Sequence, residues 1–186
     1  MNLIYQLKWK LLIPKLKKIK LIVFDVDGVL TDGGLWYNSK GELTKRFNVK
    51  DGLGIRLIQE LGVEVVFLSG GKAGSTEIRA QQLKVKHCLV EVKDKFRALT
   101  KLQQKLLITK ENTCFVGDDI NDITVRDIAK LFFVPNDSCQ SIKNIADLVL
   151  KKNGGMGAAR EIADRLLEAY GKYEIYSKIG WSDNNS

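Results

Sequence analysis

Short apolar runs alternate with amphipathic stretches from residue 21 onward. Four runs have the continuous apolar pattern of strands buried on both faces: Leu21 to Phe24, Val63 to Leu68, Thr113 to Val116 and Leu131 to Val134. Weaker candidates lie at 88–90 and 148–150, and helical spacing occupies about 52–61, 75–83, 95–107, 120–129, 138–146 and 157–170. This alternation predicts a doubly wound α/β fold, a mainly parallel, Rossmann-like sheet with helices on both faces.

Two segments fall outside this alternation. Residues 34–47, with Asn38-Ser39-Lys40-Gly41 in the middle, are typical of a β-hairpin inserted after the first strand. Before residue 21, leucines recur at helical spacing around Pro14, which predicts one or two short amphipathic helical pieces. We therefore divide the chain into an N-terminal extension (1–18), one α/β domain (19–171) and a C-terminal tail (172–186).

The net charge of +8 belongs mainly to the extension. Residues 1–20 contain six lysines and no acidic residue, which leaves only +2 for the rest of the chain. We expect a solvated lysine face over apolar packing, with weak peripheral contact to an acidic membrane or nucleic-acid binding as the alternatives. Because the domain itself carries little excess charge, we do not expect a nucleic-acid partner.

Apolar runs and cysteines bear on localisation. No apolar run approaches the roughly 20 residues that cross a bilayer, and the first residues carry lysines where a secretory signal would have an apolar core. The three cysteines are odd in number and show no Cys-x-x-Cys spacing. We expect a cytoplasmic protein with reduced thiols and without a transmembrane segment.

Carboxylates gather at the predicted strand ends, where ligands bind in an open parallel sheet. The polar residues at or just after these ends are Asp25, Asp27, Ser69, Asp118, Asp119 and Asp122, and Lys95 opens a later helix. So many carboxylates with so few cations repel one another, and a divalent cation resolves the repulsion. Since the chain has a single histidine, the ligands are oxygen atoms, which favours Mg²⁺.

The spacing Asp25-Val26-Asp27-Gly28 suits phosphoryl transfer. A turn at Gly28 lets the two carboxylates approach one reacting centre from different directions. One aspartate can attack phosphorus to form an aspartyl-phosphate, while the other transfers protons. Ser69 and Lys95, helped by backbone N–H groups of glycine-rich turns, can hold the phosphoryl oxygens.

These residues resemble a known family. Residues 25–33, Ser69-Gly70, Lys95 and residues 117–122 resemble, in order, the four motifs of the haloacid dehalogenase superfamily of phosphohydrolases. The hairpin, residues 47–55 and residues 154–161 are similar to its capless branch, which includes phosphatases of 3-deoxy-D-manno-octulosonate 8-phosphate and of nine-carbon sugar acids. The resemblance implies a phosphomonoesterase without a cap domain, acting on a 2-keto-3-deoxy sugar acid.

The resemblance also implies roles for individual residues. Asp25 would be the nucleophile and Asp27 the acid-base, with Ser69, Gly70 and Lys95 on the phosphoryl group. Mg²⁺ would bind the carboxylates of Asp25 and Asp118 and the backbone carbonyl of Asp27. Asp119 and Asp122 would support these ligands without contacting the ion. Capless relatives pack such hairpins between subunits, so a homo-oligomer, most simply a tetramer, is expected.

The position after Ser69-Gly70 departs from the branch. The octulosonate phosphatases usually have an arginine there and the nonulosonate phosphatases a glutamate, whereas this chain has Gly71. Candidate cations for the substrate carboxylate are Lys50, Lys72, Arg79 and Arg160. Two acidic residues have helix capping as an alternative role, Asp51 for helix 52–61 and Asp119 for the helix near residue 120.

Two other classes of protein remain open. A phosphoacceptor regulatory domain also places an aspartate, a hydroxyl and a lysine at strand ends, but it lacks an aspartate at the second position after the first. A weakly active or inactive interaction protein could keep the same fold in an oligomer. Steady-state phosphate release from an aryl phosphate separates these classes from an enzyme.

Overall fold

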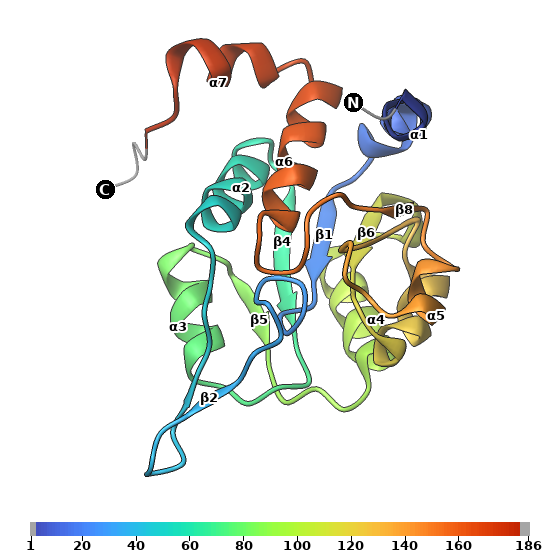
Figure 1. Ribbon diagram of the computed structural model, residues 1–186. Coiled ribbons are helices and arrows are strands. Elements are labelled where there is room, and N and C mark those ends of the chain that lie inside the picture. Colours follow the sequence, from blue (N-terminus) through green and yellow to red (C-terminus); the bar gives the residue numbers. More distant parts are fainter. Residues whose placement is uncertain (1–2, 183–186) are drawn as a thin grey trace.

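A six-stranded parallel sheet forms the centre of the computed structural model, which describes residues 3–182 (Figure 1). The strand order is β5-β4-β1-β6-β7-β8. The strands are β1 (Leu21–Phe24), β4 (Glu64–Leu68), β5 (His87–Leu89), β6 (Thr113–Val116), β7 (Leu131–Val134) and β8 (Leu148–Val149). The four strong strand predictions are confirmed, because each apolar run is buried from both sides.

Helices cover both faces of the sheet. One face carries α1 (Leu3–Leu16), α2 (Val49–Glu60), α3 (Ser75–Gln82) and α6 (Ala158–Ala169). The other carries α4 (Lys95–Leu106), the 3₁₀ helix η2 (Ile120–Ile128) and α5 (Gln140–Lys143). The short η1 (Lys110–Asn112) precedes β6, and α7 (Tyr173–Ile179) follows α6. Side chains of β1 alternate between the two cores, with Ile22 and Phe24 in the first and Leu21 and Val23 in the second.

Three helix predictions need correction. Helix α2 begins at Val49, because the Asn48 side chain accepts a hydrogen bond from the Lys50 amide at 2.8 Å and caps the helix. The predicted helix 120–129 is a 3₁₀ helix, and its Asp122 side chain turns back to the Asp118 amide. The predicted helix 138–146 shrinks to α5, since the chain is already bound to β7 at Asp147.

Asp51 does not cap α2. Its buried carboxylate accepts hydrogen bonds from the backbone N–H groups of Gly157 and Arg160, each at 3.0 Å. It therefore caps α6 from the neighbouring helix, where the positive end of the helix dipole favours an acidic group. Burial raises the pKa of this carboxyl above its ordinary value.

The N-terminal segment forms a single helix that is packed against the domain. Trp9, Leu12 and Leu16 are buried, and the ring of Trp9 meets Phe133 edge-on, 5.2 Å between centroids. The Arg165 guanidinium lies over Trp9 from α6. Pro14 sits inside the helix, near its C-terminal end. No helix within residues 3–182 has both the length and the apolar character that crossing a bilayer requires.

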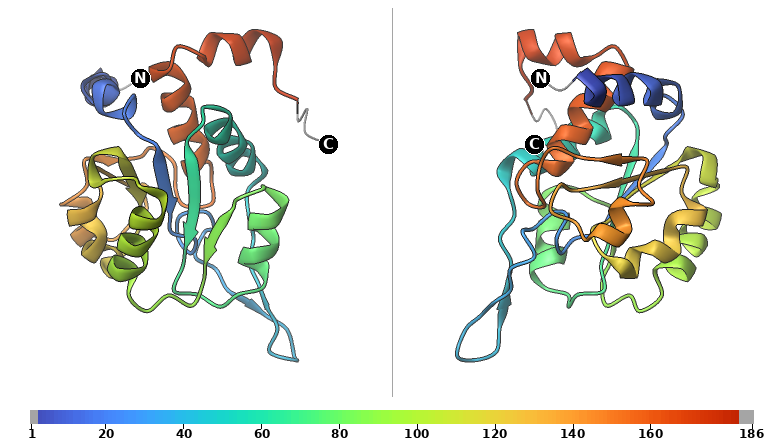
Figure 2. Two further views of the ribbon diagram at one scale, coloured as in Figure 1. Left: turned by 180° about the vertical axis from the view of Figure 1, so that it is seen from behind. Right: turned by 45° about the vertical axis from the view of Figure 1, so that its right-hand side comes forward.

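The predicted hairpin is present and projects from the body (Figures 1 and 2). It consists of β2 (Trp36–Tyr37) and β3 (Leu43–Thr44), paired antiparallel. The Asn38 side chain closes the turn by accepting from the amides of Lys40 and Glu42. Trp36 is 68% exposed. Residues 3–182 contain no cap domain, so this hairpin is the insertion that follows β1.

Candidate active site

The loops after β1, β4 and β6 converge on one cavity at the carboxyl end of the sheet. The cavity has a volume of about 430 Å³ and is lined by Asp25, Asp27, Gly28, Gly33, Ser69, Gly70, Gly71, Asp118, Asp119, Ile120 and Asn121. Asp25 follows β1, Ser69 follows β4 and Asp118 lies just beyond β6. The structure therefore brings together the strand-end residues that the sequence singles out.

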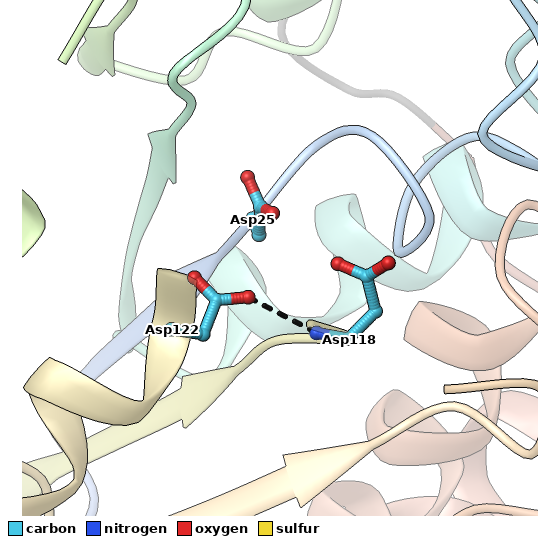
Figure 3. Close-up of side chains that lie close together, drawn as sticks. All are labelled: Asp25, Asp118 and Asp122. Atoms are coloured by element: carbon cyan, nitrogen blue, oxygen red, sulfur yellow. Dashed lines mark hydrogen bonds between the residues drawn. The ribbon is translucent and has the colours of Figure 1, made fainter. Parts of the chain in front are cut away.

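Three carboxylates form the inner part of the site. Oxygen atoms of Asp25, Asp118 and Asp122 all lie within 4.8 Å of one another (Figure 3). Asp122 is held in place because its Oδ2 accepts a hydrogen bond from the Asp118 backbone N–H at 3.0 Å. Gly28 has φ +81°, and a Cβ at this position would overlap the Asp118 carboxylate. Only a glycine therefore lets the β1 loop approach so closely.

A buried lysine bridges two of these carboxylates. Lys95 Nζ lies 3.0 Å from Asp25 Oδ2 and 2.6 Å from Asp122 Oδ1. Lys95 begins α4, directly after Asp94, whose side chain caps the helix through the Arg97 amide. Burial disfavours the charged lysine, but the negative charges of Asp25 and Asp122 outweigh burial and raise the pKa of Lys95.

One ammonium does not balance three carboxylates. Burial, followed by the neighbouring Asp122 charge, raises the pKa of Asp25 to about 7. Burial and the charges of Asp25 and Asp122 raise the pKa of Asp118 to about 8. Since all donors are oxygen atoms, the arrangement fits a hard divalent cation, which would supply the missing positive charge.

A second ion pair lies at the outer part of the site. Lys45 Nζ, buried behind the hairpin, contacts Asp27 Oδ2 at 2.9 Å and the Thr76 hydroxyl at 3.3 Å. Ser69 Oγ donates to the same Asp27 oxygen at 3.4 Å. Among the described residues Asp27 Oδ1 is buried without a hydrogen-bond partner. Asp27 is thus fixed on one oxygen, while the other is left without a protein donor.

Sequence reasoning missed Lys45. It lies outside the four motifs, on the returning arm after the hairpin, where a lysine ordinarily faces solvent. Its burial depends on the hairpin folding back toward Asp27. The available signal was a lysine two residues beyond the apolar Leu43, which is the spacing of side chains that share a face of a strand.

Gly71 faces this ion pair rather than open space. A Cβ at position 71 would lie 2.6 Å from Asp27 Oδ2 and 2.9 Å from Lys45 Nζ. The Gly71 amide donates to Ser69 Oγ at 3.0 Å. Any side chain here requires the Asp27–Lys45 pair to shift, so the glycine shapes the site as well as leaving the specificity position without a side chain.

The four candidate cations for the substrate carboxylate do not line the cavity. Lys50 and Lys72 are exposed. Arg79 donates to the Asn48 carbonyl at 3.2 Å and lies over the Phe47 ring, and Arg160 pairs with Asp164 at 2.8 Å. Asp119 does line the cavity, where it caps η2 through the Ile120 amide at 2.7 Å.

The glycine-rich loop before α6 packs against the loop that follows β1. The Gly155 amide donates to the Val29 carbonyl at 2.9 Å, and the Gly154 amide donates to Asp137 Oδ1 at 2.9 Å. A Cβ on Gly154 would overlap the Gly28 carbonyl. The loop therefore holds the turn that follows Asp25, which explains why residues 154–155 are glycines.

The chain is similar to known proteins over most of its length. A family model described as haloacid dehalogenase-like hydrolase matches residues 91–162. The 3-deoxy-D-manno-octulosonate 8-phosphate phosphatase of Haemophilus influenzae is 37% identical over 162 residues, which cover 87% of this chain and 90% of the relative. The chain belongs to the haloacid dehalogenase-like hydrolases. The corresponding phosphatase of Escherichia coli is 39% identical over 162 residues, covering 87% and 86% of the two chains.

Solved structures agree with this placement among the haloacid dehalogenase-like phosphatases. The octulosonate phosphatase of Moraxella catarrhalis, in complex with a magnesium ion, a phosphate ion and a KDO molecule, matches with a TM-score of 0.87 at 32% identity. The match covers 91% of this chain and 97% of that chain. The capless, mainly parallel fold is therefore shared across nearly the whole described domain.

Proposed function

We propose that this chain is a Mg²⁺-dependent phosphomonoesterase that hydrolyses a phosphorylated 2-keto-3-deoxy sugar acid through an aspartyl-phosphate. The observation that carries the proposal is the carboxylate cluster around Lys95, with Asp27 and Ser69 beside it in one open cavity. Relatives named for 3-deoxy-D-manno-octulosonate 8-phosphate favour that substrate, and a nonulosonate 9-phosphate is the alternative.

The chemistry divides between two aspartates. A carboxylate oxygen of Asp25 attacks phosphorus, and the bond between phosphorus and the sugar oxygen breaks as Asp27 protonates that oxygen. Asp27 then takes a proton from water, which attacks the aspartyl-phosphate and releases inorganic phosphate. Ser69, Lys95 and the amide of Gly70 hold the phosphoryl oxygens and stabilise the negative charge on them in the transition state.

Three residues that line the cavity suit the cation. The carboxylates of Asp25 and Asp118 and the backbone carbonyl of Asp27 would hold Mg²⁺, while Asp122 and Asp119 orient the β6 loop. The ion would neutralise the anionic nucleophile as the anionic substrate approaches. The raised pKa values of Asp25 and Asp118 show how poorly the protein alone stabilises both charges.

Cation binding should stabilise the protein more at pH 8 than at pH 5.5. The pKa values of Asp25 and Asp118, about 7 and about 8 when folded, exceed the ordinary value near 3.9 of an unfolded chain. Between these limits the folded state binds more protons, so the free energy of unfolding of the metal-free protein falls as pH rises. Saturating Mg²⁺ should therefore raise the Tm by about 5–10 °C at pH 8 and by much less at pH 5.5.

Thermal unfolding with Mg²⁺ or chelator at both pH values makes this comparison. Asp118→Asn is the matched control, and its Mg²⁺-dependent shift should nearly vanish at pH 8. In the natural chain, a Mg²⁺-dependent rise in Tm of equal size at the two pH values would contradict the assignment of these carboxylates to the cation.

The protein should be a homo-oligomer, most simply a tetramer. Among the described residues no lysine or arginine lines the cavity of one chain, and Lys95 and Lys45 beside it are already paired with aspartates. The projecting hairpin exposes Leu35, Trp36 and Tyr37, and hairpins of this kind are marginal alone in water. A neighbouring subunit that packs against the hairpin would bury these side chains and supply cations for the carboxylate. Light scattering at micromolar concentration should give the tetramer mass, and a monomer would contradict this.

Steady-state phosphate release from an aryl phosphate tests the reaction class. An enzyme releases many equivalents of phosphate per chain with Mg²⁺ and almost none after chelation. A phosphoacceptor domain would release about one equivalent of the aryl alcohol and keep the phosphoryl group, and an inactive interaction protein would release neither product. Cytoplasmic localisation belongs to the same proposal, and it is supported by three cysteines that are free in the described chain.

A further inference from the structure

Helix α1 has two apolar faces on opposite sides. One packs on the domain through Trp9, as described above. The other consists of Leu3, Leu7 and Leu11, which are 78%, 55% and 70% exposed. At 100° per residue these leucines lie within an arc of about 80°, centred about 170° from the buried face. Packing on the domain explains the first face and leaves the second, here called the leucine stripe, in contact with solvent.

Lysines border the leucine stripe on both sides. On the helix Lys10 lies to one side of it, and Lys8 and Lys15 lie to the other. All three are exposed, and within residues 3–182 none of them has a carboxylate at ion-pair distance. An apolar stripe with cationic borders is the pattern of a helix that lies in the plane of a lipid interface.

We propose that α1 docks this protein on the surface of an anionic lipid bilayer. The leucine stripe would enter the boundary between headgroups and acyl chains, while the lysines reach back to the lipid phosphates. Charge favours this occupant over a second copy of the chain, since residues 1–20 carry +6 and would repel their equivalent. It also favours lipid over nucleic acid, which would neutralise the lysines but leave the leucines in water.

The position of α1 keeps the catalytic end free. Strand β1 runs away from α1, Asp25 follows its carboxyl end, and both figures place α1 away from the hairpin (Figures 1 and 2). A bilayer at α1 would therefore leave the cavity open to a dissolved substrate. With three leucines and a few lysines, the contact is a reversible surface association rather than an anchor.

Vesicle sedimentation of the full chain tests the proposal. We expect it to bind vesicles that contain phosphatidylglycerol in phosphatidylcholine, to bind phosphatidylcholine alone weakly, and to dissociate as salt is raised. Lys8→Gln/Lys10→Gln/Lys15→Gln should lower the partition coefficient about 100-fold. Leu7→Ser/Leu11→Ser should lower it about tenfold or more.

Matched variants change the same residue types elsewhere on the surface. The controls are Ile78→Ser/Leu107→Ser and Lys101→Gln/Lys105→Gln/Lys110→Gln, all at exposed positions. Both control sets should bind as the natural chain does. All variants should keep its phosphate release from an aryl phosphate, which verifies that each one is folded.

Three results would overturn the proposal. The first is no binding to either vesicle, or equal binding to both. The second is a smaller mass by light scattering for Leu7→Ser/Leu11→Ser than for the natural chain. The leucine stripe would then be a contact between copies of the chain. The third is RNA binding that the lysine variant loses and the leucine variant keeps, with vesicle binding unaffected by either.

Discussion

Asp25→Asn should abolish turnover, with kcat reduced by about 10⁴-fold or more. The amide keeps the shape of the side chain but removes the attacking charge, and among residues 3–182 no histidine or cysteine lines the cavity as a substitute nucleophile. Uncatalysed phosphomonoester hydrolysis is among the slowest known reactions, so losing the covalent route leaves little activity. Initial rates with Mg²⁺ and an aryl phosphate measure the effect.

The matched control for this substitution is Asp119→Asn. Asp119 also lines the cavity, but its carboxylate is exposed and caps η2. Asp119→Asn should therefore lower kcat by no more than about tenfold, because a helix cap contributes only modest energy. Substantial turnover in purified Asp25→Asn would contradict a covalent mechanism through that residue.

Asp27→Asn should have an effect that depends on the leaving group. For a sugar phosphate, whose alkoxide must be protonated as it departs, general acid-base catalysis is worth about 10²- to 10⁴-fold. The aryloxide of an aryl phosphate leaves without protonation. The rate of the first step with this substrate should therefore fall much less in Asp27→Asn. Pre-steady-state bursts with the two substrates separate phosphorylation of the enzyme from hydrolysis of the intermediate.

Lys45→Met extends the same test. Lys45 holds Asp27 Oδ2 at 2.9 Å without lining the cavity, so we assign it a positioning role. Its loss should lower kcat for the sugar phosphate more than for the aryl phosphate, because Asp27 is no longer held at that oxygen. Lys72→Met, at an exposed lysine near the same loop, is the control.

For Asp27→Asn, an equal loss of activity with the sugar phosphate and the aryl phosphate would contradict the role of Asp27 as the proton donor.

The sheet and the inner site could be predicted because local sequence determines them. A continuous apolar run such as Leu131 to Val134 has few alternatives to a doubly buried strand, and its bounds are those of β7. Asp25 and Asp118 follow such runs directly, so the parallel sheet brings them together. The resemblance to known motifs added the order in which these residues should appear.

The remaining features depend on contacts between distant segments. Asp51 is one position inside a helix, and only the approach of α6 makes it a cap for another element. Lys45 becomes buried because the hairpin returns over Asp27. Leu3, Leu7 and Leu11 share the periodicity of a core face, yet the domain packs against the opposite side of α1. Periodicity identifies an apolar face but not the surface that covers it.

The substrate assignment can be tested by comparing kcat/KM across a panel of phosphorylated sugars and sugar acids with Mg²⁺. We expect 3-deoxy-D-manno-octulosonate 8-phosphate to be hydrolysed best, followed by nonulosonate 9-phosphates. Discrimination should be looser than in an arginine-bearing relative, because Gly71 places no guanidinium beside the cavity. A higher kcat/KM for neutral hexose phosphates or nucleotides than for every 2-keto-3-deoxy acid would contradict the assignment.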